Sequence, residues 1–155
     1  MRIGHGYDVH RFQKGRKCIL CGVEIPCEFG PDGHSDADVP VHALMDALLG
    51  AAALGDIGHH FPDNDKQYEN ISSILLLGKV MQKLIDKGYK VGNADITIIV
   101  QRPKVAKYIR EMQRKIADSL FVDIDCVNIK ATTEEGLGFT GDGSGIAAHA
   151  VVLLL

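Results

Sequence analysis

Gly4-His5-Gly6-Tyr7-Asp8-Val9-His10 is the stretch from which we derive the fold and the chemistry of this chain. If residues 2 to 12 form a strand, Asp8 and His10 project from one face, about 6.7 Å apart along the backbone. Carboxylate oxygens and imidazole nitrogens bind zinc at about 2.0–2.2 Å, so one ion could touch both. Gly4 and Gly6 lie on the same face, where they would leave room for a ligand. A half-buried strand with alternating polar residues explains the stretch equally well, and both interpretations stay open.

The composition indicates one globular domain over residues 1–155, with 46% hydrophobic and 24% charged residues. The net charge of −3 gives no general reason to expect nucleic acid or a membrane as a partner. The first residues are polar and glycine-rich, and no apolar run is long enough for a membrane-spanning helix. We therefore expect an intracellular protein, unless a transit segment was removed. Its cysteines would then stay reduced and act in packing.

The pattern of apolar residues predicts the other strands and helices. A second strand over 17–25 is expected to form a hairpin with the strand over 2–12. Further strands are predicted over 96–100, 126–131 and 146–155, and helices over 38–52, 71–87 and 104–120. Segments 26–38 and 55–70 have no clear period and are predicted to be loops.

His42 offers a third metal ligand. It lies in the first turn of the helix that Asp38 caps, off the apolar stripe of that helix. Asp46, one turn later, could accept a proton from the second ring nitrogen of His42 and so fix its tautomer. Three ligands with an open fourth position are typical of a catalytic zinc. The alternative is a capping or surface histidine, which we would favour if Asp8 and His10 were absent.

Six motifs along the chain resemble one enzyme family. They are GHGYDVH at 4–10, GHSDAD at 33–38, HALMDALLGAAALGDIG at 42–58, FPD at 61–63, KATT at 130–133 and GFTG at 138–141. The sequence is identified as a member of the 2-C-methyl-D-erythritol 2,4-cyclodiphosphate synthase family. The resemblance implies an α+β fold, a single domain whose mixed β-sheet is covered by helices on one face. It also implies a homotrimer with the sheets packed around a three-fold axis and active sites between subunits.

The resemblance implies a lyase of non-mevalonate isoprenoid precursor biosynthesis. Its substrate would be 4-diphosphocytidyl-2-C-methyl-D-erythritol 2-phosphate, whose 2-phosphate attacks its own β-phosphorus with the help of two divalent metals. The products would be 2-C-methyl-D-erythritol 2,4-cyclodiphosphate and CMP. Such a protein would work in a bacterial cytoplasm, or in a plastid stroma if a transit segment was removed.

The resemblance also assigns the site residues. Asp8, His10 and His42 would hold a zinc-like ion, and Glu135 would hold magnesium or manganese between the α- and β-phosphates. His34 and Thr133 would stabilise the transition state. Further substrate contacts would come from Ser35 and Thr132 at the phosphates, Asp56 and Gly58 at the ribose, Ile57, Phe61, Asp63 and Asp65 at the erythritol, Val100, Gln101, Arg102, Pro103, Lys104, Val105 and Ala106 around the cytosine, and Phe139.

The sequence departs from the family pattern at two positions. Position 142 is often an arginine that is thought to bind an isoprenoid diphosphate in a central cavity, whereas Asp142 would repel an anion. His149 stands where an acidic residue is common. We therefore do not expect an isoprenoid diphosphate in that cavity.

Two other classes of function compete with the synthase. A non-catalytic trimeric ligand-binding module would have no need for the two strand ligands and the helix histidine. A metal-dependent phosphohydrolase could use the same site, but it would release a linear phosphate instead of a cyclic diphosphate.

Overall fold

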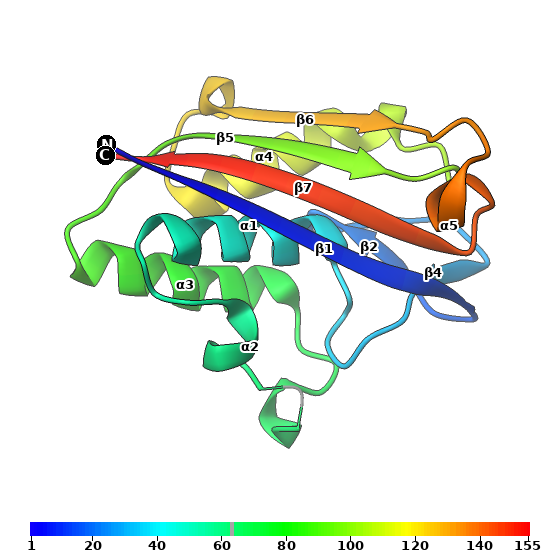
Figure 1. The fold of residues 1–155 in the computed structure, drawn as a ribbon, viewed down its shortest axis with the longest axis horizontal. Coiled ribbons are helices and arrows are strands. Elements are labelled where there is room, and N and C mark those ends of the chain that lie inside the picture. The colour runs from blue at the N-terminus through cyan, green and yellow to red at the C-terminus, as the bar shows by residue number, and fades with distance from the viewer. Residues whose placement is uncertain (63) are drawn as a thin grey trace.

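A computed structural model describes residues 1–62 and 64–155. In this part of the chain the main sheet has five strands, β1 (Arg2–Lys14), β4 (Phe29–Pro31), β5 (Val91–Ile99), β6 (Val127–Thr132) and β7 (Gly145–Leu154). Their order across the sheet is β4-β1-β7-β5-β6. β5 and β6 are parallel and the other neighbours are antiparallel, so the expected mixed sheet is confirmed. The two chain ends lie side by side, where Arg2 pairs with Leu154 (Figure 1).

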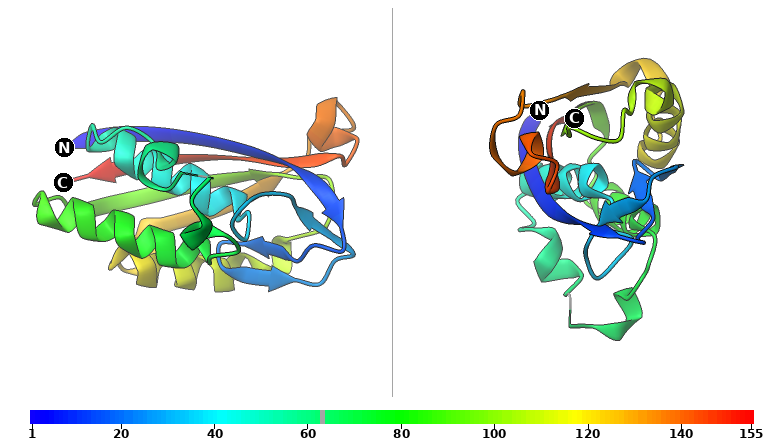
Figure 2. Two further views of the ribbon diagram at one scale, coloured as in Figure 1. Left: turned by 90° about the horizontal axis from the view of Figure 1, so that it is seen from below. Right: turned by 90° about the vertical axis from the view of Figure 1, so that its right-hand side faces the viewer.

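Three long helices cover one face of this curled sheet, as expected (Figure 2). They are α1 (Val39–Ala51), α3 (Ser73–Asp86) and α4 (Ile109–Leu120). α1 packs against β1 and β7 on one side and α3 on the other, so every residue from 39 to 49 except Asp46 is buried. Its predicted cap is confirmed, because the Asp38 carboxylate accepts a hydrogen bond from the Val41 N–H at 3.3 Å.

β1 and α1 touch through their backbones at two glycines. A β-carbon on Gly4 would lie 1.8 Å from the Ala47 carbonyl oxygen, and one on Gly6 would lie 1.9 Å from that of Ala43. The expectation that these glycines leave room for a ligand is therefore wrong, since the helix backbone fills the space. They instead allow the strand and the helix to approach more closely than any side chain would permit.

The predicted hairpin between residues 2–12 and 17–25 is wrong. Within the second segment, β2 (Cys18–Leu20) and β3 (Val23–Ile25) pair with each other in a separate two-stranded sheet. Cys21 and Gly22 between them have φ angles of +49° and +72°, so the chain reverses there. β1 pairs instead with β7 and, through Phe12 to Lys14, with β4, which lies inside the predicted 26–38 loop.

The remaining predicted elements are present with shifted ends. α3 begins at Ser73 instead of 71, and α4 begins at Ile109 because a 3₁₀ turn, Ala106–Tyr108, precedes it. The predicted 55–70 loop contains α2 (Ile57–His60) and the 3₁₀ turn Lys66–Tyr68. The other short elements are the 3₁₀ turn Ile124–Cys126 and α5 (Gly138–Gly141). Among the described residues, no helix combines the length and the apolar character that crossing a membrane requires.

The face of β1 and β7 that points away from the three long helices is open in the described chain (Figure 2). Ile3 is 75% exposed there, and Tyr7, Val9 and Val151 are each exposed by more than two fifths. These side chains form an apolar strip on a sheet surface that one chain alone does not cover.

Candidate active site

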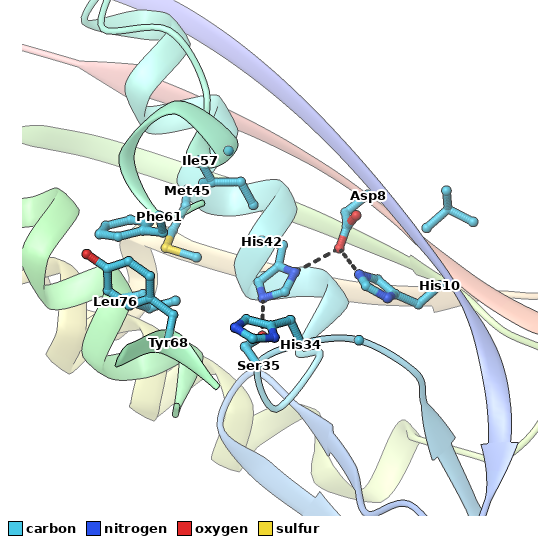
Figure 3. A pocket seen from close by; sticks show the side chains of 13 residues that line it. Asp8, His10, His34, Ser35, His42, Met45, Ile57, Phe61, Tyr68 and Leu76 are labelled. Carbon is cyan, nitrogen blue, oxygen red and sulfur yellow. Dashed lines mark hydrogen bonds and ion pairs between the residues drawn. The ribbon is translucent and has the colours of Figure 1, made fainter. Parts of the chain in front are cut away.

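Asp8, His10 and His42 converge where β1 meets the first turn of α1 (Figure 3). Asp8 Oδ2 lies 3.2 Å from His10 Nε2 and 3.1 Å from His42 Nδ1. Each residue offers one ligand atom, and these atoms lie within 4.8 Å of one another. The three candidate ligands are therefore close enough for one divalent ion to touch them all.

The second nitrogen of each imidazole already has a hydrogen-bond partner. His10 Nδ1 bonds the carbonyl oxygen of Asp32, and His42 Nε2 lies 2.9 Å from the Ser73 hydroxyl. Each ring consequently directs its other nitrogen at Asp8. One carboxylate oxygen and two oriented imidazole nitrogens fit a zinc-like ion that keeps an open position for substrate.

The predicted partnership between Asp46 and His42 is wrong. The Asp46 carboxylate accepts a hydrogen bond from the backbone N–H of Ile57 at 2.8 Å, at the start of α2. The second nitrogen of His42 faces Ser73 instead, 31 residues along the chain. Ser73 was not expected at the site, because a serine at the start of a helix indicates a cap and not a partner for a distant histidine.

Two of the triad residues, Asp8 and His10, have pKa values shifted by their surroundings. Burial raises the pKa of Asp8, but hydrogen bonds from His10 and His42 outweigh burial and bring this pKa down to about 2. The hydrogen bond with Asp8 raises the pKa of His10, while burial opposes the shift. Asp8 is therefore an anion at neutral pH, available to a cation or to a protonated imidazole.

A pocket of about 320 Å³ opens beside the triad, with His34 and Ser35 near His42 and an apolar wall beyond them (Figure 3). It brings together eight of the expected site residues, Asp8, His10, His34, Ser35, His42, Ile57, Gly58 and Phe61. Met45, Tyr68 and Leu76 line the apolar wall and were missed. Met45 and Leu76 belong to helices, where apolar residues indicate core, and Tyr68 lies in a segment predicted to be a loop.

A second pocket, of about 340 Å³, lies where β5 and β6 end. Eight further expected residues line it, Val100, Pro103, Lys104, Val105, Ala106, Thr132, Thr133 and Glu135. The Thr133 hydroxyl donates to Glu135 Oε1 at 2.8 Å, so these two candidate phosphate and metal contacts lie side by side. Phe139 lines a third hollow, which adjoins the triad pocket because Val9 and His10 line both.

The other expected residues lie outside both pockets. Asp56 caps α2 through the His59 N–H at 2.9 Å, and the carbonyl of Asp65 accepts a hydrogen bond from His34 Nε2 at 3.2 Å. Arg102 is exposed, whereas the side-chain oxygen of Gln101 is buried and has no hydrogen-bond partner in the described part of the chain. Asp63 lies outside the described residues.

The two pockets share no lining residue. The triad pocket lies at β1, and the second pocket lies at the ends of β5 and β6, toward the other edge of the sheet. Asp8 pairs with Ala148, Ala148 with Ile98, and Ile98 with Ala131 beside the second pocket. Three strand spacings of about 4.8 Å place Asp8 and Ala131 roughly 14 Å apart across the sheet. Within one chain the triad and the second pocket therefore belong to separate hollows.

This α+β fold, with a carboxylate and two imidazoles close together beside a pocket, is consistent with the class of proteins that bind a divalent metal next to a small-ligand site. The sequence comparisons are more specific. The YgbB family model matches residues 1–155, and the chain belongs to the YgbB family.

Named relatives confirm the resemblance inferred from the six motifs. A curated protein from Lachnospira eligens, 2-C-methyl-D-erythritol 2,4-cyclodiphosphate synthase, is 60% identical over 99% of this chain and 84% of its own length. A solved synthase of the same name, in a form bound to CDP, is 37% identical with a TM-score of 0.91, covering 99% of this chain and 100% of that one. The bifunctional IspDF from Campylobacter jejuni is 42% identical with a TM-score of 0.95, and this chain covers only 42% of that longer protein.

Proposed function

We propose that this chain converts 4-diphosphocytidyl-2-C-methyl-D-erythritol 2-phosphate to 2-C-methyl-D-erythritol 2,4-cyclodiphosphate and CMP. It is an enzyme, a lyase of isoprenoid biosynthesis, with the activity for which its relatives are named. The observation that carries the proposal is the convergence of Asp8, His10 and His42 beside a pocket that holds five more of the expected residues.

The two proposed metal sites lie in different pockets. Asp8, His10 and His42 would hold zinc, while Glu135 would hold magnesium or manganese together with substrate phosphates, a pattern usual for magnesium. Bound there, the ions would neutralise phosphate charge that otherwise keeps the two reacting phosphates apart. The fixed orientation of both imidazoles supports the zinc assignment, because their free nitrogens already point at Asp8.

The side chains of the triad pocket would hold the substrate folded back on itself. Ile57, Phe61 and Gly58 line the space where the erythritol and ribose would lie, and His34 of the same pocket would donate a hydrogen bond to a phosphate oxygen. Thr133, which lines the second pocket, would donate to a phosphate oxygen from the neighbouring subunit. A 2-phosphate oxygen then bonds to the β-phosphorus as the bond from that phosphorus to the CMP oxygen breaks. Nucleophile and electrophile belong to one molecule, so alignment alone can supply up to about 7–11 kcal/mol, and no covalent enzyme intermediate is needed.

The second pocket would hold the cytidine end of the substrate. Its walls come from residues 100–106, the stretch expected around the cytosine, and it ends at Thr132, Thr133 and Glu135 where phosphates would lie. A relative of similar structure binds CDP, which supports a cytidine nucleotide as the ligand here.

We propose a homotrimer in which each active site joins the triad pocket of one subunit to the cytidine pocket of its neighbour. The distance across the sheet between the two hollows supports this arrangement. So does the apolar strip of Ile3, Tyr7, Val9 and Val151, which would be covered if the sheets pack around a three-fold axis.

The whole chain, residues 1–155, would act as one synthase domain without nucleic acid or membrane as a partner. The proposed location is the bacterial cytoplasm, or a plastid stroma if a transit segment was removed. The bacterial source of the relative from Lachnospira eligens supports the first of these.

The central test is product formation by the purified enzyme. With the cytidine substrate and divalent metal we expect CMP and the cyclic diphosphate in equal amounts, and His42→Ala should reduce both to background because the triad loses a ligand. The matched control is His59→Ala, which removes an exposed histidine of α2 and should leave the rate unchanged.

Each alternative predicts a different result in the same assay. A linear phosphate product would identify a phosphohydrolase, and substrate binding without turnover would identify a binding module. Full CMP release by His42→Ala would contradict the role given to the triad.

A further inference from the structure

We propose that Ser73 and Asp36 form a hydrogen-bond relay that fixes the tautomer of His42 and so presents its Nδ1 to the metal ion. The inference rests on the proposed metal role of the triad and adds two positioning residues that do not touch the substrate. Neither residue was expected at the site from the sequence.

The relay joins a buried serine to a half-buried carboxylate and is held from two sides. Ser73 is the first residue of α3 and is fully buried, with its hydroxyl 2.9 Å from His42 Nε2. The same hydroxyl donates to Asp36 Oδ1, and Asp36 Oδ2 accepts the Ser73 N–H at 3.0 Å. Asp36 thus holds both the hydroxyl and the backbone of the serine. Its own N–H donates to the Ile71 carbonyl at 3.1 Å, which ties the loop at residues 33–38 to the start of α3.

The chemistry of a carboxylate sets the direction of these hydrogen bonds. An ionised carboxylate has no hydrogen to donate, so the Ser73 hydroxyl must donate to Asp36. A hydroxyl has one hydrogen, and therefore Ser73 can only accept from His42 Nε2. In the metal-bound state the hydrogen of the neutral ring would lie on Nε2. The ion would then take the place of the Nδ1 hydrogen that bonds Asp8 Oδ2, 3.1 Å away, when no metal is bound.

Ser35 cannot replace Ser73 in this role, although it lies 3.2 Å from the same nitrogen. Its hydroxyl oxygen accepts from the Ala37 N–H at 3.2 Å, and in the described chain no carboxylate accepts its hydrogen. That hydrogen can turn toward Nε2 and favour the opposite tautomer. Only Ser73, whose hydroxyl donates to Asp36, fixes the direction of the hydrogen bond with His42 Nε2.

Zinc affinity tests the relay without measuring turnover. In a titration against a competing chelator, Ser73→Ala should bind zinc about 10–100-fold more weakly than the wild type, the usual cost of losing such a partner. Ser72→Ala is the matched control, because Ser72 is the neighbouring serine and makes no capping hydrogen bond. It should bind zinc as the wild type does.

Asp36→Asn provides a second variant that keeps Ser73. An asparagine amide can donate to the serine hydroxyl, which frees the hydroxyl to donate to His42 Nε2. Zinc binding should therefore weaken even though every triad residue and Ser73 are intact. ¹⁵N NMR of the zinc-loaded wild type should find the His42 hydrogen on Nε2, with slow exchange that Ser73→Ala accelerates.

Two results would overturn the relay. One is equal zinc affinity in Ser73→Ala and Ser72→Ala, and the other is a His42 hydrogen on Nδ1 in the zinc-loaded wild type. The NMR measurement needs no variant, so a failure of Ser73→Ala to fold does not remove the test. If the wild type itself bound no zinc, the proposed metal site would be refuted together with the relay, whereas normal wild-type binding with unaffected variants would refute the relay alone.

Discussion

His10 and His42 direct different ring nitrogens at Asp8, Nε2 from the strand residue and Nδ1 from the helix residue. The difference follows from their second partners. The Asp32 carbonyl accepts from His10 Nδ1, and the Ser73 hydroxyl lies against His42 Nε2. At this scale the site consists of three candidate ligand atoms, and the two imidazoles among them are oriented by residues outside the triad.

The pair of Asp8 and His10 predicts how the stability of the metal-free protein depends on pH. Because the pKa of His10 is raised in the folded protein, its contribution to the free energy of unfolding is fully present below the unfolded value of 6.5 and is lost as pH rises through the raised value. The low pKa of Asp8 adds stability above its ordinary value of 3.8, which is lost as pH falls toward about 2.

Urea unfolding between about pH 5 and 9 measures the upper part of this profile. The free energy of unfolding should fall with rising pH in the metal-free wild type, and His10→Ala should make that fall shallower. The remaining fall comes from Asp38, because burial raises the pKa of its carboxyl to about 7. His59→Ala is the control for loss of an unrelated histidine. The same slope in His10→Ala and in the wild type would show that the shift at His10 does not contribute.

Sequence alone could predict the three candidate ligands but not which of their atoms converge. Asp8 and His10 share a strand face, and this follows from a period of two residues. The second partner of His42 does not follow, since local spacing favours Asp46, one turn away, whereas the ring bonds Ser73 on another helix. Partners that only tertiary packing brings together leave no local signal.

Contact between β1 and α1 organises the elements around the site. Gly4 and Gly6 let the two backbones meet. The candidate ligands lie next to this contact, Asp8 two residues after Gly6 on β1 and His42 beside Ala43 on α1. Periodicity predicted α1, α3 and α4 because each runs for more than three turns. β2, β3 and β4 have three residues each, too few to show a period, and so they were predicted as part of a longer strand or as a loop.

Replacing Gly6 with alanine tests the contact between the two backbones. The new β-carbon would lie 1.9 Å from the Ala43 carbonyl oxygen, so Gly6→Ala should lower the free energy of unfolding by about 3 kcal/mol or more. Gly50→Ala is the control, because its β-carbon on α1 would meet no atom within 4 Å and the change should stabilise the helix by about 0.5–1 kcal/mol. A Gly6→Ala protein as stable as the wild type would contradict the packing described.

For the molecule as a whole, the main question is how two separate hollows serve one substrate. Of the site residues that the resemblance implied, eight line the triad pocket and eight line the second pocket, whereas Asp56, Asp65, Gln101 and Arg102 lie outside both. Sequence order cannot show that Asp8 and Thr133 lie toward opposite edges of one sheet, because only the strand order places them there. The open face with Ile3 exposed likewise emerges only from the assembled sheet.

Mixed trimers test whether sites form between subunits. His42→Ala lacks a triad ligand and Glu135→Gln lacks the second metal ligand, so each variant alone should be inactive. After unfolding and joint refolding in equal amounts, a neighbour-to-neighbour site has both residues intact in about a quarter of cases, and activity should return to roughly that fraction of wild type. Each variant refolded by itself is the control. Activity of the mixture no higher than the controls would place each complete site within one chain.

The contact between β1 and α1 at two glycines has a consequence for how the enzyme would lose and regain a metal ion. Asp8 and His42 sit on parts of the core that cannot separate unless the hydrophobic interior opens, so the geometry of the centre is established during folding and before any ion arrives. If the triad binds an ion as proposed, a chain stripped by a chelator would keep Asp8 and His42 together, and the ion could bind again without any refolding.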